Sequence, residues 1–327
     1  MRAHLIVNPS SGTDRAVEML PVIQSRLGTL FQDLVVTVTA DADDLRRAAA
    51  RTAAGNYAAL YVAGGDGTLN GALRGMLDAN PLPAIPIGVI PFGTGNDFSK
   101  ALGLGDEPER ALDCLVDPHV VAADVGVMNE RPFINASAGG LIAETSGIAT
   151  PALKDIAGKV AYLIGGARAL FTADPLNVRL LVASEHARGA DPAPQLLPVG
   201  DSAVQMFAVC NAPFIGGGYA IAPDALIDDG LFDVIVVPRM PLLELLATLQ
   251  RIASAGDPGR ADVLSFRSAH FDLVFDRRAR VNIDGEVLEV DRCAYRVRSG
   301  GAWFFCGPRP LAASVPVSFA DWQRGHQ

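Results

Sequence analysis

A short apolar run that ends in glycines constrains the fold of this chain more than any other feature. Residues 59–63 read Ala-Leu-Tyr-Val-Ala, which is typical of a buried strand, and Gly64, Gly65 and Gly67 follow directly. A helical pattern of apolar residues then runs over residues 69–77. A strand, a glycine turn and a helix direct backbone N–H groups toward a phosphate, and the glycines allow its close approach. This stretch therefore indicates a phosphate site.

Asp66 lies inside that turn, where a carboxylate would repel a phosphate. Its position makes sense if the carboxylate meets a magnesium ion or accepts the proton of an incoming hydroxyl. The alternative is a structural turn in which Asp66 only caps the following helix. These residues alone leave both interpretations open.

Strands and helices alternate along the chain to about residue 115, which predicts a parallel sheet with helices on both faces. Ligands of such sheets bind beyond the carboxyl ends of the strands. Gly-rich turns follow three of the predicted strands, at residues 8–12, 64–68 and 93–97. We therefore expect the three turns to share one edge of the sheet.

Beyond about residue 120, strand-like segments dominate and the alternation with helices stops. This pattern predicts a second, mostly antiparallel domain of packed sheets. Strands are expected at 120–127, 132–136, 177–183, 203–209, 231–237, 270–275, 280–283 and 302–306, helices at 159–171 and 242–254, and a loop at 185–195. The tail after Pro308 either docks on a domain through Phe319 and Trp322 or touches a membrane surface.

The charge and the cysteines exclude several classes of protein. A net charge of −9 and a pI near 5.0 argue against nucleic acid as a partner. The four cysteines form no CxxC pair, which favours free thiols in a reducing cytoplasm and disfavours a zinc site. The two long uncharged stretches, 79–96 and 202–223, are interrupted by Pro, Gly or Asn, and no signal peptide is visible at Met1. We expect a cytoplasmic protein.

Four motifs occur in an order that resembles the diacylglycerol kinase/sphingosine kinase catalytic family, and most closely its soluble bacterial lipid kinases. They are Asn-Pro-Ser-Ser-Gly at 8–12, Gly-Gly-Asp-Gly-Thr-Leu-Asn at 64–70, Gly-Thr-Gly-Asn-Asp-Phe at 93–98 and Asn-Ile-Asp-Gly-Glu at 282–286. The similarity continues through residues 216–225 and 228–233, and it covers the chain to about Pro308. Gly-Gly-Asp-Gly-Thr alone also occurs in NAD kinases and phosphofructokinases, so the ordered set carries the resemblance.

The resemblance implies an α/β, Rossmann-like ATP-binding domain over residues 1–123 and a β-sandwich domain for the lipid substrate over 124–308. Residues 309–327 would then form a C-terminal tail. The positions that match ATP-binding positions of the family are Asn8, Pro9, Ser10, Ser11, Gly12, Thr39, Gly64, Gly65, Asp66, Gly67, Thr68, Leu69, Asn70 and Thr94. The chain departs from many relatives at Thr13-Asp14, where they place a second small or basic residue.

The resemblance assigns catalytic roles to three acids. Asp66 and Asp97 match positions that the family needs for activity, and Glu286 matches its proton acceptor. Asp284-Gly285 is by itself a two-residue hairpin signal, so a plain turn is the alternative. Glu286 is favoured as the base, with Asp66 then holding Mg²⁺ on the phosphates; Asp66 as the base stays open. A helix cap is the alternative for Asp97.

A second magnesium site is implied at Asp228, the Leu231 carbonyl and Asp233, because bacterial members hold a structural ion at these positions. Oxygen donors this close in sequence suit a hard cation, and a solvated acidic turn is the alternative. Arg277, Arg278 and Arg280 form a basic cluster close to Glu286 in sequence. The cluster either faces lipid headgroups or marks a charged strand edge.

The resemblance thus predicts an ATP- and Mg²⁺-dependent lipid kinase of phospholipid biosynthesis that converts diacylglycerol to phosphatidic acid. Its partners would be ATP and a lipid at a membrane surface that the protein contacts transiently, and a homodimer is left open. The alternatives are an NAD-kinase-like enzyme acting on a soluble metabolite and a catalytically silent regulator that binds nucleotide or lipid.

Overall fold

Four strands pair in parallel at the N-terminal end of the molecule. In the computed structural model, which describes residues 1–12, 15–81, 83–140, 176–183, 196–255 and 259–326, these strands follow the order β2-β1-β3-β4. They are β1 (Arg2–Val7), β2 (Asp33–Val38), β3 (Ala59–Gly64) and β4 (Ile87–Pro91). Strands β3 and β4 are fully buried, as their unbroken apolar sequences predict.

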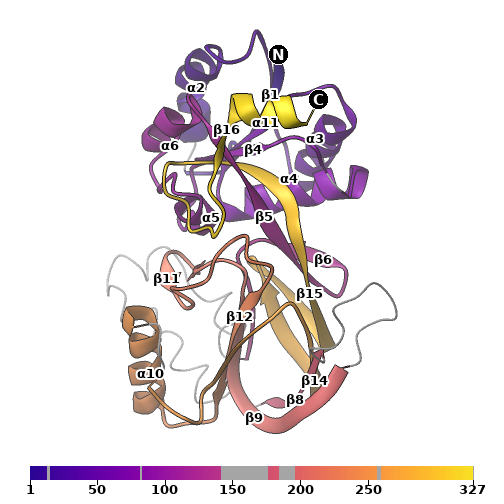
Figure 1. The fold of residues 1–327 in the computed structure, drawn as a ribbon, viewed down its shortest axis with the longest axis vertical. Helices are drawn as coiled ribbons and strands as arrows, with labels where there is room; N and C mark the ends of the chain where they lie inside the picture. Colours follow the sequence, from indigo (N-terminus) through magenta and orange to yellow (C-terminus); the bar gives the residue numbers. More distant parts are fainter. Residues whose placement is uncertain (13–14, 82, 141–175, 184–195, 256–258, 327) are drawn as a thin grey trace.

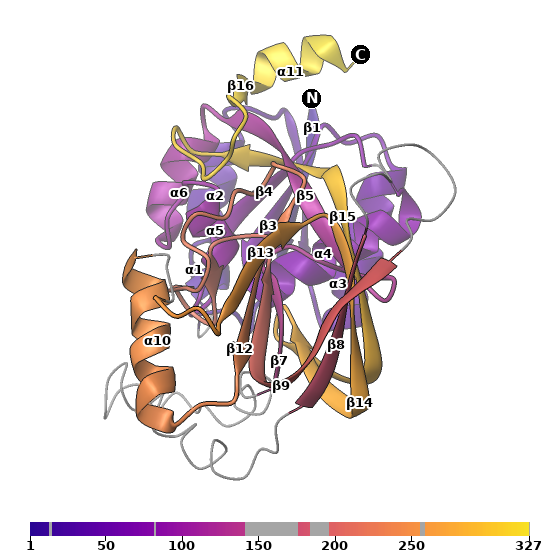
Figure 2. The same cartoon turned by 60° about the horizontal axis from the view of Figure 1, so that its bottom comes forward.

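Helices cover both sides of these strands. They are α1 (Arg15–Glu18), α2 (Leu20–Leu27), α3 (Ala42–Ala54), α4 (Asp66–Ala79), α5 (Asp97–Ala101) and α6 (Pro108–Leu115). Helices α3 and α4 pack together on one side, and α2 and α6 pack on the other (Figure 2). Helix α3 begins where Asp41 accepts a hydrogen bond from the Asp44 amide, the capping that its acidic first turn predicts.

The second half of the chain is built mainly from antiparallel strands. They are β5 (His119–Met128), β6 (Arg131–Phe133), β7 (Ala136–Gly140), β8 (Leu176–Ala183), β9 (Leu196–Cys210), β10 (Phe214–Ile215), β11 (Tyr219–Ala220), β12 (Phe232–Pro238), β13 (Leu264–Ser268), β14 (His270–Ile283), β15 (Glu286–Cys306) and β16 (Val317–Ser318). The helices described alongside them are α10 (Leu242–Ala255) and α11 (Phe319–Gly325). The predicted helix at 159–171 and loop at 185–195 lie outside the described residues.

One strand joins the two halves into a single sheet. Strand β15 pairs with β14 at its start, with β5 along much of its length, and in parallel with β4 where Phe304 meets Ile87 (Figure 1). The β15–β5 register shifts between Arg298 and Ala302, where the strand passes from one half to the other. The change from an α/β part to a strand-rich part is confirmed, but an independent, wholly parallel Rossmann-like sheet is not.

The end of the chain completes the core of the N-terminal part. Phe304, Phe305, Phe319 and Trp322 are buried in the same cluster as β1, β3 and α4. Strand β16 pairs with β5, so the tail docks, which was the first of the two sequence alternatives. Within the described residues, no helix is long and apolar enough to cross a membrane. The boundaries at residues 123 and 308 stay predictions.

Candidate active site

Two of the predicted glycine turns touch each other at the carboxyl edge of the parallel strands. A Cβ atom added to Gly65 would lie 2.9 Å from the Gly93 Cα, and one added to Gly93 would lie 2.6 Å from the Gly65 Cα. The first turn adjoins them, because a Cβ at Gly12 (φ +66°) would lie 2.8 Å from the Phe92 carbonyl oxygen. The expectation that the three turns share one edge is confirmed.

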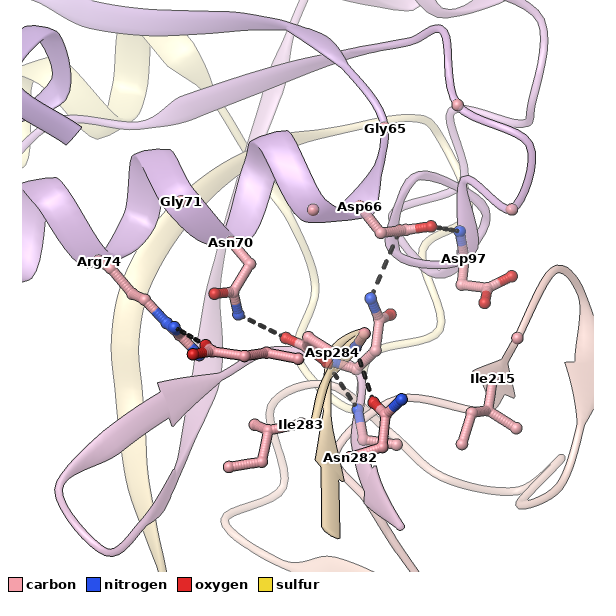
Figure 3. A pocket seen from close by; sticks show the side chains of 18 of the residues that line it. Gly65, Asp66, Asn70, Gly71, Arg74, Asp97, Ile215, Asn282, Ile283 and Asp284 are labelled. Carbon is pink, nitrogen blue, oxygen red and sulfur yellow. Dashed lines mark hydrogen bonds and ion pairs between the residues drawn. The ribbon is translucent and has the colours of Figure 1, made fainter. Parts of the chain in front are cut away.

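A cavity of about 970 Å³ lies between these turns and the second half of the chain. Its N-terminal wall includes Gly65 and Asp66 (Figure 3). Gly67 and residues 93–95 line the same wall. Its other wall is formed mainly by residues 282–286 and 215–217. Of the residues predicted to bind ATP, Gly65, Asp66, Gly67, Asn70 and Thr94 line this cavity.

The other predicted nucleotide-binding residues lie behind or beside that wall. The Asn8 side chain donates to the Thr68 hydroxyl at 2.9 Å, and a Cβ at Gly64 would lie 2.6 Å from the Thr68 side chain. The Thr39 hydroxyl is buried and donates to the Val7 carbonyl at 3.3 Å. The residues predicted to bind ATP that do not line the cavity are Asn8, Pro9, Ser10, Ser11, Gly12, Thr39, Gly64, Thr68 and Leu69.

Asp66 caps a helix, but not the helix that follows it. Its carboxylate oxygens accept hydrogen bonds from the backbone N–H groups of Asp97 and Phe98, each at 3.1 Å, at the N-terminus of α5. The Asn135 side-chain amide donates to it at a longer distance, 3.4 Å. The interpretation that Asp66 caps its own helix is therefore wrong, because Gly65 occupies the N-cap position of α4.

Asp97 faces the same cavity from the first turn of α5. Its Oδ2 accepts the Gly217 N–H at 3.0 Å, whereas its Oδ1 is buried and has no hydrogen-bond partner within the described part of the chain. Burial raises the pKa of this carboxyl, and the Gly217 N–H opposes the rise. Gly217 belongs to a loop of three glycines, 216–218, all with positive φ. The run of glycines was the sequence signal for this loop.

The hairpin between β14 and β15 turns on Asp284 and Gly285, with φ values of +47° and +95°, so the predicted two-residue turn is confirmed. The Asp284 carboxylate accepts four hydrogen bonds. The donors are the backbone N–H groups of Ile134 (2.8 Å), Asn135 (3.0 Å) and Ala136 (3.0 Å) and the Asn70 side chain (2.6 Å). Burial raises the pKa of Asp284 to about 6, against these donors, which lower it. Sequence reasoning gave Asp284 only the role of a turn residue.

Glu286 stands one residue past the turn and lines the cavity. Its two oxygens pair with the Arg74 Nη1 at 2.5 Å and the Arg131 Nη1 at 2.9 Å. The Arg74 hydrogen bond holds the pKa of this carboxyl below its usual range. The Glu286 side chain is 44% exposed and that of Arg74 only 9%. Sequence reasoning missed both arginines; the signal for Arg74 was a charge within the apolar helical pattern of α4.

The predicted metal residues lie in a group of acids at the start of β12. Asp228 accepts the backbone N–H groups of Ala313 (2.5 Å) and Ser314 (2.8 Å), while Asp229 and Asp233 both pair with Arg267. The buried Asp233 Oδ2 has no hydrogen-bond partner among the described residues, and burial raises the pKa of this carboxyl. No three described Asp, Glu, His or Cys side chains are already arranged around a common point as a metal site.

The basic cluster is exposed, but it lies away from the cavity. Arg277, Arg278 and Arg280 precede Ile283, the last residue of β14, by six, five and three positions. At about 3.3 Å per residue, they stand roughly 10–20 Å from the hairpin turn. Proximity to Glu286 in the sequence is therefore not proximity in the fold.

Comparison with known proteins gives two family matches that together cover most of the chain. Residues 2–128 match the diacylglycerol kinase catalytic domain, and residues 139–300 match the YegS C-terminal NAD kinase beta sandwich-like domain. The diacylglycerol kinase of Staphylococcus saprophyticus is 31% identical over 286 residues, which are 87% of this chain and 88% of that protein. The diacylglycerol kinase of Staphylococcus carnosus is 32% identical with the same coverage.

A solved structure shares the fold across the whole molecule. A diacylglycerol kinase structure from Bacillus anthracis str. Sterne superimposes with a TM-score of 0.72 at 21% identity, covering 95% of this chain and 98% of that one. The structure shows the shared fold, and the family models and sequence relatives establish that the chain belongs to the diacylglycerol kinase catalytic family and is a lipid kinase.

Proposed function

We propose that this lipid kinase transfers the γ-phosphoryl group of ATP to the hydroxyl of diacylglycerol and releases phosphatidic acid. The observation that carries the proposal is one cavity with a glycine edge on one wall and Glu286 on the other. In phosphoryl transfer the protein mainly positions the reactants and stabilises charge. A cleft with these two walls supplies both functions. The relatives named diacylglycerol kinase support this choice of lipid.

The N-terminal wall suits the phosphates of ATP. A Cβ at Gly67 would meet no described atom within 4 Å, so the first turn of α4 is open to the cavity. The unsatisfied N–H groups of a helix N-terminus bind anions. We assign the nucleotide to this edge, with Thr94 beside it and Asn8–Gly12 and Thr39 supporting the turns from behind. Asn70, for which the resemblance implies a nucleotide contact, lines the same cavity.

Asp66 and Asp97 are the proposed holders of the magnesium ion that accompanies the phosphates. The buried Oδ1 of Asp97, which has no partner within the described residues, fits a hard cation. When bound, the ion neutralises charge on the phosphates. The two acids hold it, and the Asp66 bonds to α5 keep them adjacent.

Glu286 is the proposed base. A base must reach the hydroxyl of the lipid, and Glu286 is half-exposed at the tip of a rigid hairpin in the cavity wall. The Arg74 hydrogen bond lowers the pKa of Glu286, so the carboxyl is ionised at neutral pH, which is the state that can accept a proton. Asp66 suits this role less well, because backbone N–H groups, whose positions the fold determines, hold both its oxygens. The oxygens of Glu286 are also paired, but with arginine side chains, of which Arg131 is half-exposed.

A second ion is proposed at Asp228, the Leu231 carbonyl and Asp233. The support is the buried Oδ2 of Asp233, in the acidic group at β12, which has no hydrogen-bond partner in the part of the chain that the structure describes. Mg²⁺ should then raise the melting temperature of wild type without nucleotide, because an ion that binds only the folded chain stabilises it. Asp233→Asn should abolish that rise; an equal rise in both proteins, measured by calorimetry, would show that these acids form only a turn.

The deciding experiment is a kinase assay with labelled ATP against diacylglycerol, sphingosine and NAD, the lipids being presented in mixed micelles. NAD is included because the C-terminal family model is described as NAD kinase beta sandwich-like. We expect label in phosphatidic acid and none in NADP, with Glu286→Gln as the matched inactive control. Label in NADP alone, or in a lipid other than phosphatidic acid, would contradict the proposed substrate. Contact with a membrane surface and a homodimer stay predictions.

A further inference from the structure

We propose that Asn70 and Arg74 are positioning residues. They bind the β14–β15 hairpin to helix α4 and thereby fix the position of Glu286 in the cleft. The inference rests on the proposed role of Glu286 as base. It also gives Asn70 a function distinct from the nucleotide contact that the family resemblance implies.

The spacing of the four residues matches across the cleft. Asn70 and Arg74 are four residues apart on α4, so they lie one above the other on the same helix face. Asp284 and Glu286 are two residues apart on the hairpin. Asn70 donates to Asp284 at 2.6 Å, and Arg74 donates to Glu286 at 2.5 Å (Figure 3). Two side chains one helical turn apart on α4 thus bind two acids of the hairpin.

Asp284 ties this contact to the junction between the two halves of the chain. Three of its hydrogen bonds come from the backbone of residues 134–136, which connect β6 to β7, and its own N–H donates to the Ala136 carbonyl at 3.1 Å. These bonds hold the turn to the C-terminal half. Of the hydrogen bonds described for Asp284, the one from Asn70 connects it to the N-terminal half.

Arg74 adds an ion pair to the contact between α4 and the hairpin. Its side chain is almost fully buried, and its Nε also donates to the Pro132 carbonyl at 3.4 Å. A buried guanidinium keeps few alternative positions, so the Glu286 oxygen that it holds is confined as well. Arg131, the second partner of Glu286, is half-exposed and constrains less.

The expected effect on catalysis follows from the geometry of the reaction. A shift of about 1 Å in a catalytic group lowers the rate by about a hundredfold. Asn70→Ala leaves Asp284 bound to residues 134–136 but releases the hairpin from α4. We therefore expect kcat to fall by about ten- to a hundredfold while the KM for ATP changes less than twofold. A rise in the KM for ATP with unchanged kcat would instead make Asn70 a nucleotide contact and overturn the inference.

The matched control is Asn129→Ala. The Asn129 side chain also forms hydrogen bonds to residues far along the chain: it donates to the Arg292 carbonyl at 2.6 Å and accepts the Ala294 N–H at 2.9 Å. Unlike Asn70, it does not line the cavity. We expect this variant to keep kcat within twofold. An equal loss of kcat in both variants would mean that Asn70 acts through general stability alone.

Two further readouts do not depend on turnover alone. Hydrogen exchange at residues 284–286 should be faster in Asn70→Ala than in wild type or Asn129→Ala, whereas residues 134–136, which Asp284 still binds, should exchange as in wild type. Unchanged exchange at 284–286 would overturn the inference. Arg74→Gln removes the charge that lowers the Glu286 pKa, so the acid limb of kcat/KM should move to higher pH; an unmoved limb would exclude Arg74.

The Glu286→Gln variant separates this inference from the proposed function. If it is inactive while Asn70→Ala and Arg74→Gln are fully active, the positioning role fails and the base survives. If it is fully active, the proposed base fails and with it the positioning of that base, whatever the exchange at the hairpin.

Discussion

The two walls of the cavity hold their acids in different ways. On the N-terminal wall, Asp66 is engaged by backbone N–H groups of α5, whose positions the fold determines. On the opposite wall, Glu286 is engaged by the side chains of Arg74 and Arg131 and is 44% exposed. An acid held by backbone is part of the scaffold. An acid held by side chains can exchange a partner for a substrate.

The difference extends to what each wall offers a ligand. The N-terminal wall presents backbone from the glycine turns, two of which touch each other at Gly65 and Gly93. The hairpin wall presents the charged group of Glu286, while the Asp284 carboxylate next to it is already engaged by the backbone of residues 134–136 and by Asn70. Backbone dipoles suit a constant ligand such as the phosphates, whereas side chains suit a group whose charge changes during the reaction. The comparison thus supports the division of roles proposed for the two walls.

The largest expected effect comes from the hairpin wall. Glu286→Gln keeps the shape of the side chain but cannot accept the proton, so kcat should fall by roughly 10²–10⁴, the usual contribution of a general base. Steady-state kinetics with diacylglycerol in mixed micelles provides the measurement. The melting temperature should stay close to wild type, since the hairpin turn needs Gly285 rather than Glu286. Turnover within twofold of wild type would remove Glu286 from the mechanism.

The equivalent change on the N-terminal wall should affect stability as well. Asp66→Asn places an amide NH₂ where one carboxylate oxygen accepts an α5 amide, so one N–H of α5 loses its partner. Loss of a helix cap costs about 1 kcal/mol, and activity should fall at least about a hundredfold. Urea unfolding and kinetics of the same preparation test both. Lost activity with wild-type stability would show that the Asp66 cap of α5 does not stabilise the fold, which would contradict the comparison of the two walls.

The smallest effect concerns pH. The folded pKa of Glu286 lies below its ordinary value of 4.5, so its pairing stabilises the protein above that value and the contribution is lost as pH falls through the folded pKa. The difference in unfolding free energy between wild type and Glu286→Gln should therefore be constant from pH 5 to 7 and shrink below pH 4.5. Because Glu286 is half-exposed, it should stay below about 1 kcal/mol. A difference that grows toward acid pH would contradict the ion pair.

Local patterns in the sequence predicted the parts of the site that local chemistry determines. The glycine turns and the Asp284-Gly285 hairpin follow from residues adjacent in the chain, and both are confirmed. The partners of the acids could not be predicted in this way, because Arg74 and Glu286 are 212 residues apart. The cap that Asp66 supplies to α5 also crosses between two elements, so the sequence indicated a cap but for the wrong helix.

The fold shows the same limit. Alternating strands and helices predicted the order of elements up to α6, and the described strands from β5 onward agree with the predicted strand-rich part. No local sequence pattern shows that β15 pairs with β4, because the pairing joins Phe304 to Ile87, which are far apart in the chain. A long strand with a register shift looks in sequence like two separate strands: residues 270–275 and 280–283 were predicted apart but both belong to β14, whose register shifts between Val274 and Ala279. Of β15, only its end at residues 302–306 was predicted.

The reach of β15 has a consequence for the synthesis of the protein. The edge of β4 emerges from the ribosome roughly 220 residues before the segment of β15 that pairs with it. At about 5–20 residues per second, that interval lasts about 10–40 seconds. Until then the first half of the nascent chain carries an unpaired strand edge and lacks the Phe304, Phe305 and Phe319 side chains of its core. An open edge of this kind pairs readily with other chains, so the nascent first half is exposed to wrong pairing until this segment of β15 has been made.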